Sequence, residues 1–329
     1  MTNFEAPRVW LAPMSGATDA PFRRQAVRFG APAVVSEMVA GESLAADRED
    51  VVRRICRHEG NSPWIVQLAG RRPEDMLQGA RRVVAEGVDV IDINMGCPAR
   101  KVTGGQSGSA LMRDLDLATR IIEATLEGAA GTPVTLKMRL GWDDQMLNAP
   151  ELAEIAQGLG VQMLTVHGRT RCQFYKGVAD WERVRETVEH VSLPVIVNGD
   201  VHGPDTARAA LSVSGAHGVM LGRAAMGRPW LVGQIAAALS GSAWTEPNPE
   251  EQLDSLLEQI DDSVDLYGAY LGVRTVRKHV SAAIDAIEQF KPEELRRQTR
   301  SRLCQIGCPE ELKQALSIVY AEQFQREVA

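Results

Sequence analysis

The sequence predicts an α/β fold in which a closed (β/α)8 barrel is followed by a small all-α helical bundle. Short runs of apolar and β-branched residues recur along the first 225 residues, and helical stretches such as 73–85, 115–126 and 181–188 lie between them. Strand–helix alternation repeated eight times predicts an all-parallel sheet, and eight repeats in this length are typical of a closed TIM barrel. A doubly wound open sheet is the alternative, but the first predicted turn has no G-x-G-x-x-G pattern. The expected strands are 9–11, 33–35, 64–66, 90–93, 134–136, 163–166, 194–197 and 218–221.

The pattern changes near Leu239, where we expect the barrel to end. Residues 240–249 are rich in Ser, Gly, Pro and Asn, which is typical of a linker. Beyond them the periodicity is helical throughout, and we expect about four helices up to Val328, with Pro292 and Pro309 at helix starts. The predicted division is therefore a barrel domain over 1–240, a linker over 241–248 and a helical domain over 249–329.

Composition restricts the class of protein. A hydrophobic content of 44% and a charged content of 24% are those of a globular protein with a full core. The N-terminus has no apolar signal-peptide core and no run of about 18 apolar residues occurs, so we expect a cytoplasmic protein with no membrane partner. The five scattered cysteines suit a reducing compartment, and no metal site is expected.

The charge distribution is more informative than the net charge of −7, which argues against indiscriminate binding of nucleic acid. Residues 246–265 hold eight acidic residues and no basic one, whereas residues 274–302 hold eight basic residues against four acidic ones. The second half of that basic stretch has acids first and bases last. It therefore fits either contact with phosphates or simple complementarity to the dipole of a helix.

Cys97 lies in Asn94-Met95-Gly96-Cys97-Pro98, directly after a predicted buried strand. In a barrel of this kind the loops after the strands meet at one face, and that face carries the chemistry. A thiol with an ordinary pKa near ~8.5 is mostly protonated at neutral pH, so it can deliver a proton. The alternative for Cys97 is a buried structural cysteine.

Two glycine-containing loops point to a phosphate group. Gly199-Asp200 follows the seventh strand and Gly222-Arg223 follows the eighth, which are the two loops whose backbone N–H groups commonly bind phosphate in this fold. Glycine lets the backbone come close, and Arg223 adds a charged fork. The pair predicts a cofactor that carries a phosphate.

Lys137 lies within an apolar strand, where an unpaired ammonium group is costly to bury. It could pair with a carboxylate of the barrel. It could instead face a ring that gains negative charge, as a reduced flavin does. Gln67 and His167 could hydrogen-bond the same ring, although a buried histidine satisfied by backbone groups is also common.

Taken together, these motifs resemble those of the tRNA-dihydrouridine synthase family, and within it most the bacterial B-type branch once labelled as nitrogen-regulation proteins. The matching segments cover the whole barrel in order, and the helical tail matches more loosely around Arg277-Lys278-His279. The segments are 12–19, 92–102, 137–139, 167–170, 198–200 and 222–225.

The resemblance implies an enzyme that reduces a D-loop uridine of tRNA to 5,6-dihydrouridine, with position 17 of the tRNA as the expected site. NADPH reduces a bound FMN, the reduced flavin gives a hydride to C6 of the uracil ring, and Cys97 protonates C5. The expected chain is a monomer whose helical domain binds tRNA. The residues expected to hold FMN are Ala12, Pro13, Met14, Gln67, Lys137, His167, Asn198, Gly199, Asp200, Gly222 and Arg223.

Contacts with tRNA are expected from polar and basic residues around the barrel mouth and in the tail. Phe174 and Tyr175 would add stacking faces on the loop after the sixth strand, unless that loop is an ordinary solvated one. Arg100 stands where the family usually has lysine, and 281–283 lack the aromatic residue often found there. The expected tRNA contacts are Asn94, Lys101, Arg139, Arg169, Arg171, Arg274, Arg277 and Lys278.

Two other functions fit part of the pattern. A flavin-dependent barrel that reduces a free small molecule needs no RNA surface, and the basic helical segment counts against it. A non-catalytic RNA-binding regulator would not need Cys97 and Lys137 together at the mouth.

Overall fold

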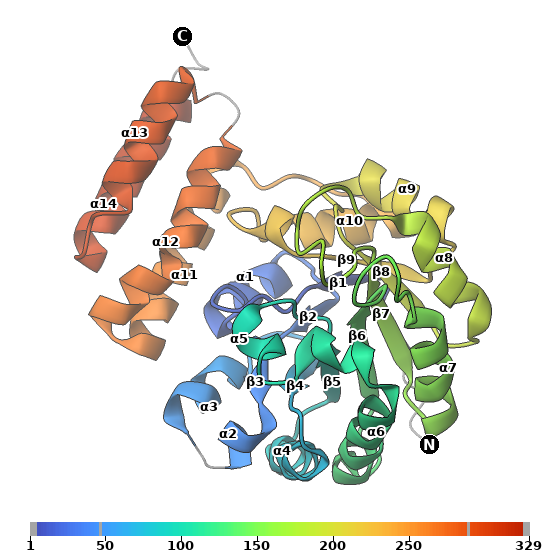
Figure 1. Cartoon of the computed structure of the whole chain (residues 1–329). Helices are drawn as coiled ribbons and strands as arrows, with labels where there is room; N and C mark the ends of the chain where they lie inside the picture. The colour runs from blue at the N-terminus through green and yellow to red at the C-terminus, as the bar shows by residue number, and fades with distance from the viewer. Residues whose placement is uncertain (1–4, 46–47, 288–289, 325–329) are drawn as a thin grey trace.

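The computed structural model describes residues 5–45, 48–287 and 290–324, and its central feature is a closed parallel β-barrel (Figure 1). The sheet closes because β2 pairs with β1 on one side and with β4 on the other. The predicted (β/α)8 barrel is therefore confirmed, with each of the eight strands where the sequence indicated. The strands are β1 (Val9–Leu11), β2 (Ala33–Val35), β4 (Trp64–Ala69), β5 (Val90–Met95), β6 (Val134–Arg139), β7 (Met163–His167), β8 (Val195–Asn198) and β9 (Gly218–Leu221).

A ninth strand, β3 (Val39–Ala40), was not predicted. It pairs in parallel with the end of β4, at Leu68 and Ala69. Two residues are too few to show the alternation that marks a strand in a sequence.

Helices surround the barrel, and several begin at the start signals that the sequence carries. Asp114 caps α6 by accepting a hydrogen bond from the backbone N–H of Leu117 at 2.9 Å, and Asp180 caps α8 in the same way. The helices are α1 (Ala20–Arg28), α2 (Gly41–Ala45), α3 (Glu49–Ile55), α4 (Pro73–Ala85), α5 (Arg100–Thr103), α6 (Leu115–Ala129), α7 (Ala149–Leu159), α8 (Trp181–His190), α9 (Pro204–Ser214) and α10 (Leu231–Ser240), with 3-10 turns η1 (Gly108–Arg113) and η2 (Arg223–Ala225).

The interior of the barrel changes character along its axis. Its lower part is an apolar floor that includes Trp10, Ile65, Met163 and Met220. The next layers towards the carboxyl ends of the strands are polar. Gln67 on β4 lies opposite Asp92 on β5, and Asp92 lies opposite Thr135 on β6. One end of the barrel interior is thus a packed apolar core, and the end towards the carboxyl ends of the strands is polar.

Four helices follow the barrel and share a hydrophobic core of their own. Asn248 and Glu251 form a capping box at the start of the first of them, and the third and fourth begin after Pro292 and at Pro309, as predicted. Residues 325–328, which the prediction included in the last helix, lie outside the described residues. The helices are α11 (Pro249–Tyr267), α12 (Ala269–Ala286), α13 (Glu293–Leu303) and α14 (Pro309–Phe324).

The helical part packs against the first βα unit of the barrel. Arg28 of α1 pairs with Glu258 of α11 at 2.7 Å. His279 of α12 donates from Nε2 to the carbonyl oxygen of Ala17 at 3.1 Å, and its ring packs on Phe22 with centroids 4.3 Å apart. Gly227, after β9, lies so close to the backbone of α12 that a Cβ there would collide with Ala283. These contacts hold α12 next to the mouth of the barrel.

Among the described helices, none has both the length and the apolar character needed to cross a membrane.

Candidate active site

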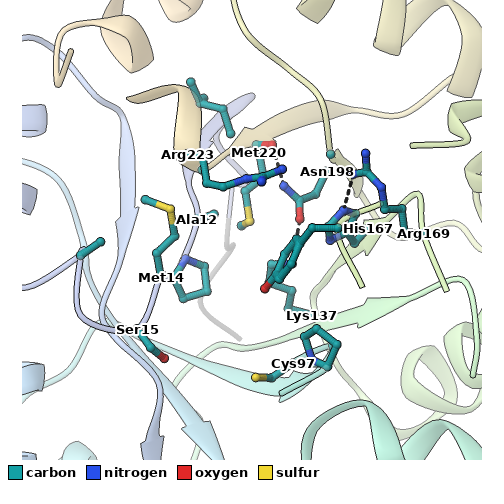
Figure 2. A pocket seen from close by; sticks show the side chains of 18 of the residues that line it. Ala12, Met14, Ser15, Cys97, Lys137, His167, Arg169, Asn198, Met220 and Arg223 are labelled. Carbon is teal, nitrogen blue, oxygen red and sulfur yellow. Dashed lines mark hydrogen bonds between the residues drawn. The ribbon is translucent and has the colours of Figure 1, made fainter. Parts of the chain in front are cut away.

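A cavity of about 470 Å³ opens at the carboxyl ends of the barrel strands (Figure 2). Residues from all eight barrel strands, or from the loops that follow them, line it, and Lys278 of α12 lines it as well. Most of the residues predicted from the sequence lie in its wall. Those in the wall are Ala12, Pro13, Met14, Gln67, Asn94, Cys97, Lys137, Arg139, His167, Arg169, Asn198, Gly199, Asp200, Gly222, Arg223 and Lys278, whereas Lys101, Arg171, Arg274 and Arg277 lie elsewhere.

Cys97 is half-buried in the cavity wall and carries a free thiol (Figure 2). Its backbone N–H donates to Oδ1 of Asn94 at 3.0 Å. Its carbonyl oxygen accepts from the backbone N–H and the hydroxyl of Ser109, at 3.1 and 2.9 Å. Gly108 has a φ of +61° and lies against Cys97, where a Cβ would come within 2.8 Å of the carbonyl oxygen. The turn that carries the thiol is therefore held by hydrogen bonds to its backbone N–H and carbonyl groups and by close packing against Gly108.

Lys137 is 8% exposed and faces the cavity. Its Nζ donates to Oδ1 of Asn198 at 2.9 Å, and Nδ2 of Asn198 donates to the carbonyl oxygen of Met220 at 2.9 Å (Figure 2). Burial lowers the pKa of Lys137 to about 8, and the charge of Arg139 lowers it too, while Asp92 acts in the opposite direction. The ammonium group has no carboxylate within ion-pair distance in the part of the chain that the structure describes, so an anionic ligand would supply the missing charge.

His167 is a neutral imidazole in a cationic surrounding. Burial, followed by the charges of Arg139, Lys137 and Arg169, holds the pKa of His167 well below its usual value. Its Nε2 lies 3.3 Å from Nη1 of Arg169. Because a guanidinium group can only donate, Nε2 accepts, and we assign the proton to Nδ1.

Asp200 accepts two hydrogen bonds at one carboxylate oxygen, from Arg169 and from the backbone N–H of Ala179, both at 2.7 Å. Partial burial would raise the pKa of Asp200, but these two donors outweigh it, and the pKa is lowered. One carboxylate oxygen of Asp200 is thus bound by the loop after β7. The φ of +55° at Asp200 turns the chain sharply at this point.

Arg139 and Arg169 were both expected to contact tRNA, and the structure shows that their side chains are already bound within the protein. They are 1% and 2% exposed. Arg139 donates to the carbonyl oxygens of Gly96, Thr170 and Phe174, at 2.7, 2.8 and 2.8 Å. Arg169 is held by Asp200 and by two backbone carbonyls. Through these bonds both side chains stabilise the cavity wall. Strand alternation could have shown this for Arg139, because it lies two residues after the inward-facing Lys137.

Arg171 also differs from the expectation of a free phosphate contact. Its guanidinium carbon lies 4.6 and 4.8 Å from the ring centroids of Trp142 and Phe174. Its Nη2 donates to Thr103 at 3.2 Å. Arg171 thus contacts segments that follow β5, β6 and β7 and joins them to one another.

The remaining predicted tRNA contacts differ in how accessible they are. Lys101 is exposed on α5, and Arg274 is exposed on α12 with its guanidinium over Tyr270, 5.3 Å from the ring centroid. Arg277 is half-buried and donates to the carbonyl oxygen of Ile306 at 3.1 Å. Lys278 reaches the cavity. Surface cations near the mouth therefore come mainly from α5 and from one face of α12.

Basic groups dominate the cavity wall although the whole chain is acidic. The wall contains Lys137, Arg139, Arg169, Arg223 and Lys278, and its one acidic residue, Asp200, is paired with Arg169. Such a cavity favours a ligand that carries negative charge. Tyr175, which is 53% exposed, lies over Arg139 and Arg223 at the rim, with guanidinium carbons 5.5 and 5.2 Å from its ring centroid.

Several residues of the wall were not found from the sequence. Met38 comes from the loop after β2, and Ser15, His202 and Met226 come from other loops. The signal for Met38 was its position, because Ser36-Glu37-Met38 directly follows a barrel strand. Glu37 beside it is 6% exposed and accepts from the backbone N–H of Gly16, which orders the loop after β1.

Comparisons with known structures agree with the architecture. A variant of morphinone reductase in complex with tetrahydroNAD aligns with a TM-score of 0.51 at 16% identity, over 74% of this chain and 90% of that one. A complex of 2-naphthoyl-CoA reductase with 2-naphthoyl-CoA aligns with a TM-score of 0.52 at 12% identity, over 71% of this chain and 50% of the other. At these identities the likeness shows a common barrel fold.

The sequence comparisons identify the family. The family model described as "Dihydrouridine synthase (Dus)" matches residues 10–324. A protein of Rhodobacter capsulatus named "Probable tRNA-dihydrouridine synthase" is 51% identical over 276 residues, which is 83% of this chain and 85% of that protein. The "tRNA-dihydrouridine synthase B" of Xanthomonas campestris pv. campestris is 43% identical over 84% of this chain and 83% of its own. The chain belongs to the dihydrouridine synthase family, and the resemblance seen in its motifs is confirmed.

Proposed function

We propose that this chain reduces a D-loop uridine of tRNA to 5,6-dihydrouridine, with FMN as its bound cofactor and NADPH as the reductant. Cys97 is the proton donor in this proposal. The observation that carries it is the placement of a free thiol and a buried ammonium group in the wall of one cationic cavity, in a chain of this family.

The residues of the cavity fit a flavin mononucleotide. A cavity of about 470 Å³ lies in the range of about 300–1,000 Å³ that small-molecule sites occupy. The phosphate would lie at the loops after β8 and β9. Gly199 has a φ of +112°, and a Cβ there would lie 2.7 Å from Cβ of Ala179; a Cβ on Gly222 would lie 3.2 Å from Sδ of Met14, so both positions favour glycine. Arg223 lines the cavity beside them.

Lys137, Gln67 and His167 would hold the ring of the cofactor. When bound, the flavin supplies the hydride that adds to C6 of uracil. Lys137 offers its ammonium group to negative charge that accumulates on the ring, and its bond to Asn198 keeps that ammonium group in place. The proton on Nδ1 makes the neutral imidazole of His167 a donor that carries no additional charge.

Cys97 would complete the reaction by giving its proton to C5 of uracil, where negative charge accumulates as C6 is reduced. The balance is one uridine, one NADPH and one proton converted to one dihydrouridine and one NADP⁺. A protonated thiol suits this step because it is neutral beforehand and its thiolate would be stabilised by the cations in the wall. The fixed turn around Cys97 would keep the sulfur in one place.

The tRNA would reach the cavity with its target uridine turned out of the stack, which costs a few kcal/mol. Lys278 and Arg274 on α12, Lys101 on α5 and the half-exposed Tyr175 are available to receive it. A substrate that must pass between the barrel and the helical part fits this arrangement better than a free small molecule does.

The experiment is to purify the protein, identify its flavin, and incubate it with NADPH and tRNA that lacks dihydrouridine. Flavin released by heat should be FMN and not FAD, and mass spectrometry of digested tRNA should show dihydrouridine. NADPH oxidation with a free enone but not with tRNA would favour a small-molecule reductase. Binding of tRNA without any flavin would favour a non-catalytic regulator.

A further inference from the structure

In the barrel, the carboxyl group of Asp92 and the side-chain amides of Gln67 and Asn94 form one continuous hydrogen-bonded chain, which ends at the turn of Cys97. Asp92 accepts from the hydroxyl of Thr135 at 2.6 Å with Oδ1 and from Nε2 of Gln67 at 2.7 Å with Oδ2. Oε1 of Gln67 accepts from Nδ2 of Asn94 at 2.8 Å. Oδ1 of Asn94 accepts from the backbone N–H of Cys97 at 3.0 Å and that of Gly96 at 3.4 Å.

The chain has only one consistent direction. A carboxylate can only accept, so Gln67 must present its NH₂ group to Asp92 and its oxygen to Asn94. Asn94 must then present its NH₂ group to Gln67, which leaves its oxygen for the turn at Cys97. If Gln67 were rotated by half a turn, NH₂ would face NH₂, and the backbone N–H groups of the turn would lose their acceptor.

Asp92 itself is remote from the ligand. It is 2% exposed and does not line the cavity, whereas Gln67 and Asn94 do. Burial raises the pKa of Asp92, which the hydrogen bonds from Thr135 and Gln67 and the charge of Lys137 oppose. The direction of the chain is also kept when Asp92 is protonated on Oδ1, because Oδ1 can then donate to Thr135 while Oδ2 still accepts from Gln67.

We propose that Asp92 is a positioning residue that sets the orientation of the Gln67 and Asn94 amides and thereby fixes the Cys97 thiol relative to the ring held by Gln67. This proposal rests on the proposed function for its catalytic consequence but not for its structural one. Asp92 would then position both Gln67, which holds the cofactor ring, and Cys97, which donates the proton.

Four variants separate the effect of amide orientation from the effects of charge and of packing. Asp92→Ala removes the acceptor, and Asp92→Val does so while filling part of the volume, in case the alanine variant does not fold. Asp92→Asn can keep one oxygen towards Gln67 and turn its NH₂ group to the hydroxyl of Thr135, so it preserves the direction of the chain without the charge. Thr135→Val removes the other partner of Asp92 and leaves the bond to Gln67.

The first measurement is the rate at which iodoacetamide alkylates Cys97 in the purified protein, followed by mass spectrometry with the exposed Cys172 and Cys308 as internal references. We expect alkylation of Cys97 in Asp92→Ala or Asp92→Val to be at least about threefold faster, because the turn opens locally. Asp92→Asn and Thr135→Val should match the wild type. An unchanged rate in both Asp92→Ala and Asp92→Val, or an equal acceleration in Asp92→Asn, overturns the proposal.

The second measurement is formation of dihydrouridine. Loss of one buried hydrogen bond in this chain should lower kcat about tenfold while KM for tRNA stays the same. In the Cys97→Ala background, with flavin kept saturating, Asp92→Ala should cause a much smaller further loss than in the wild type, because there is no thiol to position, whereas an unrelated structural defect would cause the same loss in both backgrounds. A wild-type protein that forms no dihydrouridine would refute the proposed function, while the alkylation rates would still decide the role of Asp92.

Discussion

Nζ of Lys137 and Oδ1 of Asn198 lie 2.9 Å apart, and the Asn198 amide cannot turn away because its NH₂ group is bound to Met220. The only partner of the buried ammonium in the described part of the chain is thus a neutral amide. Burial without a counter-charge lowers the pKa of Lys137 to about 8. An ammonium group held in this way is prepared for an anionic ligand and destabilises the protein until one arrives.

Lys137→Met should therefore have opposite effects on stability and activity. In the folded protein the pKa is below its unfolded value of 10.5, so the charged lysine costs stability fully below pH 8, and the cost disappears as the pH approaches 10.5. The variant should be more stable without flavin, by up to about 3 kcal/mol at pH 7. It should reduce its flavin with NADPH at least about tenfold more slowly, because a nearby charge is lost.

Denaturant unfolding of the flavin-free protein at pH 7 and pH 10, together with stopped-flow reduction, tests both effects. Lys176→Met, which changes an exposed lysine on the loop after β7, is the control and should change neither.

Cys97→Ala should leave flavin binding and NADPH oxidation nearly intact while abolishing most dihydrouridine formation, since in the proposed reaction the thiol acts only on uracil. The change should lower the rate with tRNA by a factor of about 10² to 10⁴, as expected for loss of a general acid. Cys172→Ala on the neighbouring loop is the matched control, because Cys172 is exposed and does not line the cavity. Near-normal turnover with tRNA would return Cys97 to a structural role.

The basic segment of the helical part divides into two groups, and they should respond differently to salt. Arg300 is bound to both carboxylate oxygens of Asp285, at 2.8 and 2.7 Å, and Arg297 is bound to Glu294. Arg297 is thus paired within α13 and Arg300 is paired with α12, so both guanidinium groups already have carboxylate partners inside the helical part. Arg274 and Lys278 lie on the face of α12 that leads to the cavity.

Arg274→Ala and Lys278→Ala should each reduce the salt dependence of tRNA affinity by a slope of roughly 0.7 to 0.9, while Arg300→Ala should not. Filter binding at several salt concentrations measures this. Equal slopes for all four proteins would mean that tRNA binds elsewhere.

The burial of His279 should make the protein sensitive to acid, although its hydrogen bond to Ala17 acts in the opposite direction on the pKa. Burial, and then the charge of Lys278, lower the pKa of His279 to about 3, below its unfolded value of 6.5. The unfolded chain therefore binds the proton more readily between these values, and stability falls as the pH drops below 6.5. At pH 5 the loss is about 2 kcal/mol.

His279→Gln can keep the hydrogen bond to Ala17 without the titration. Its unfolding midpoint in urea should fall less between pH 7.5 and pH 5 than that of the wild type. His190→Gln, a change at the exposed end of α8, should follow the wild type.

The fold was largely predictable because every barrel strand is buried on both sides and so appears as an apolar, β-branched run. The site was predictable for the same reason, since the carboxyl ends of parallel strands in a closed barrel must converge. That geometry places Cys97, Lys137 and His167 in one cavity whatever the surrounding detail.

The features that could not be predicted are side-chain positions that depend on contacts with residues distant in the sequence. The guanidinium of Arg139 turns inward because carbonyl oxygens of the loop after β7 are there to accept from it. Lys278 reaches the cavity only because α12 lies against the loop after β1, and the periodicity of a helix contains no information about such packing. The role of Asp92 depends on three strands being aligned in one register.

Gly227 lies at the contact between the barrel and the helical part of the molecule. Because Gly227 has no side chain, α12 can approach the barrel closely at this point. Any larger residue there would push α12 away from the barrel. Such a residue would shift Lys278 relative to Cys97 while leaving every polar group of the site chemically unchanged. The distance between α12 and the thiol of Cys97 therefore depends on a position that carries no functional group at all.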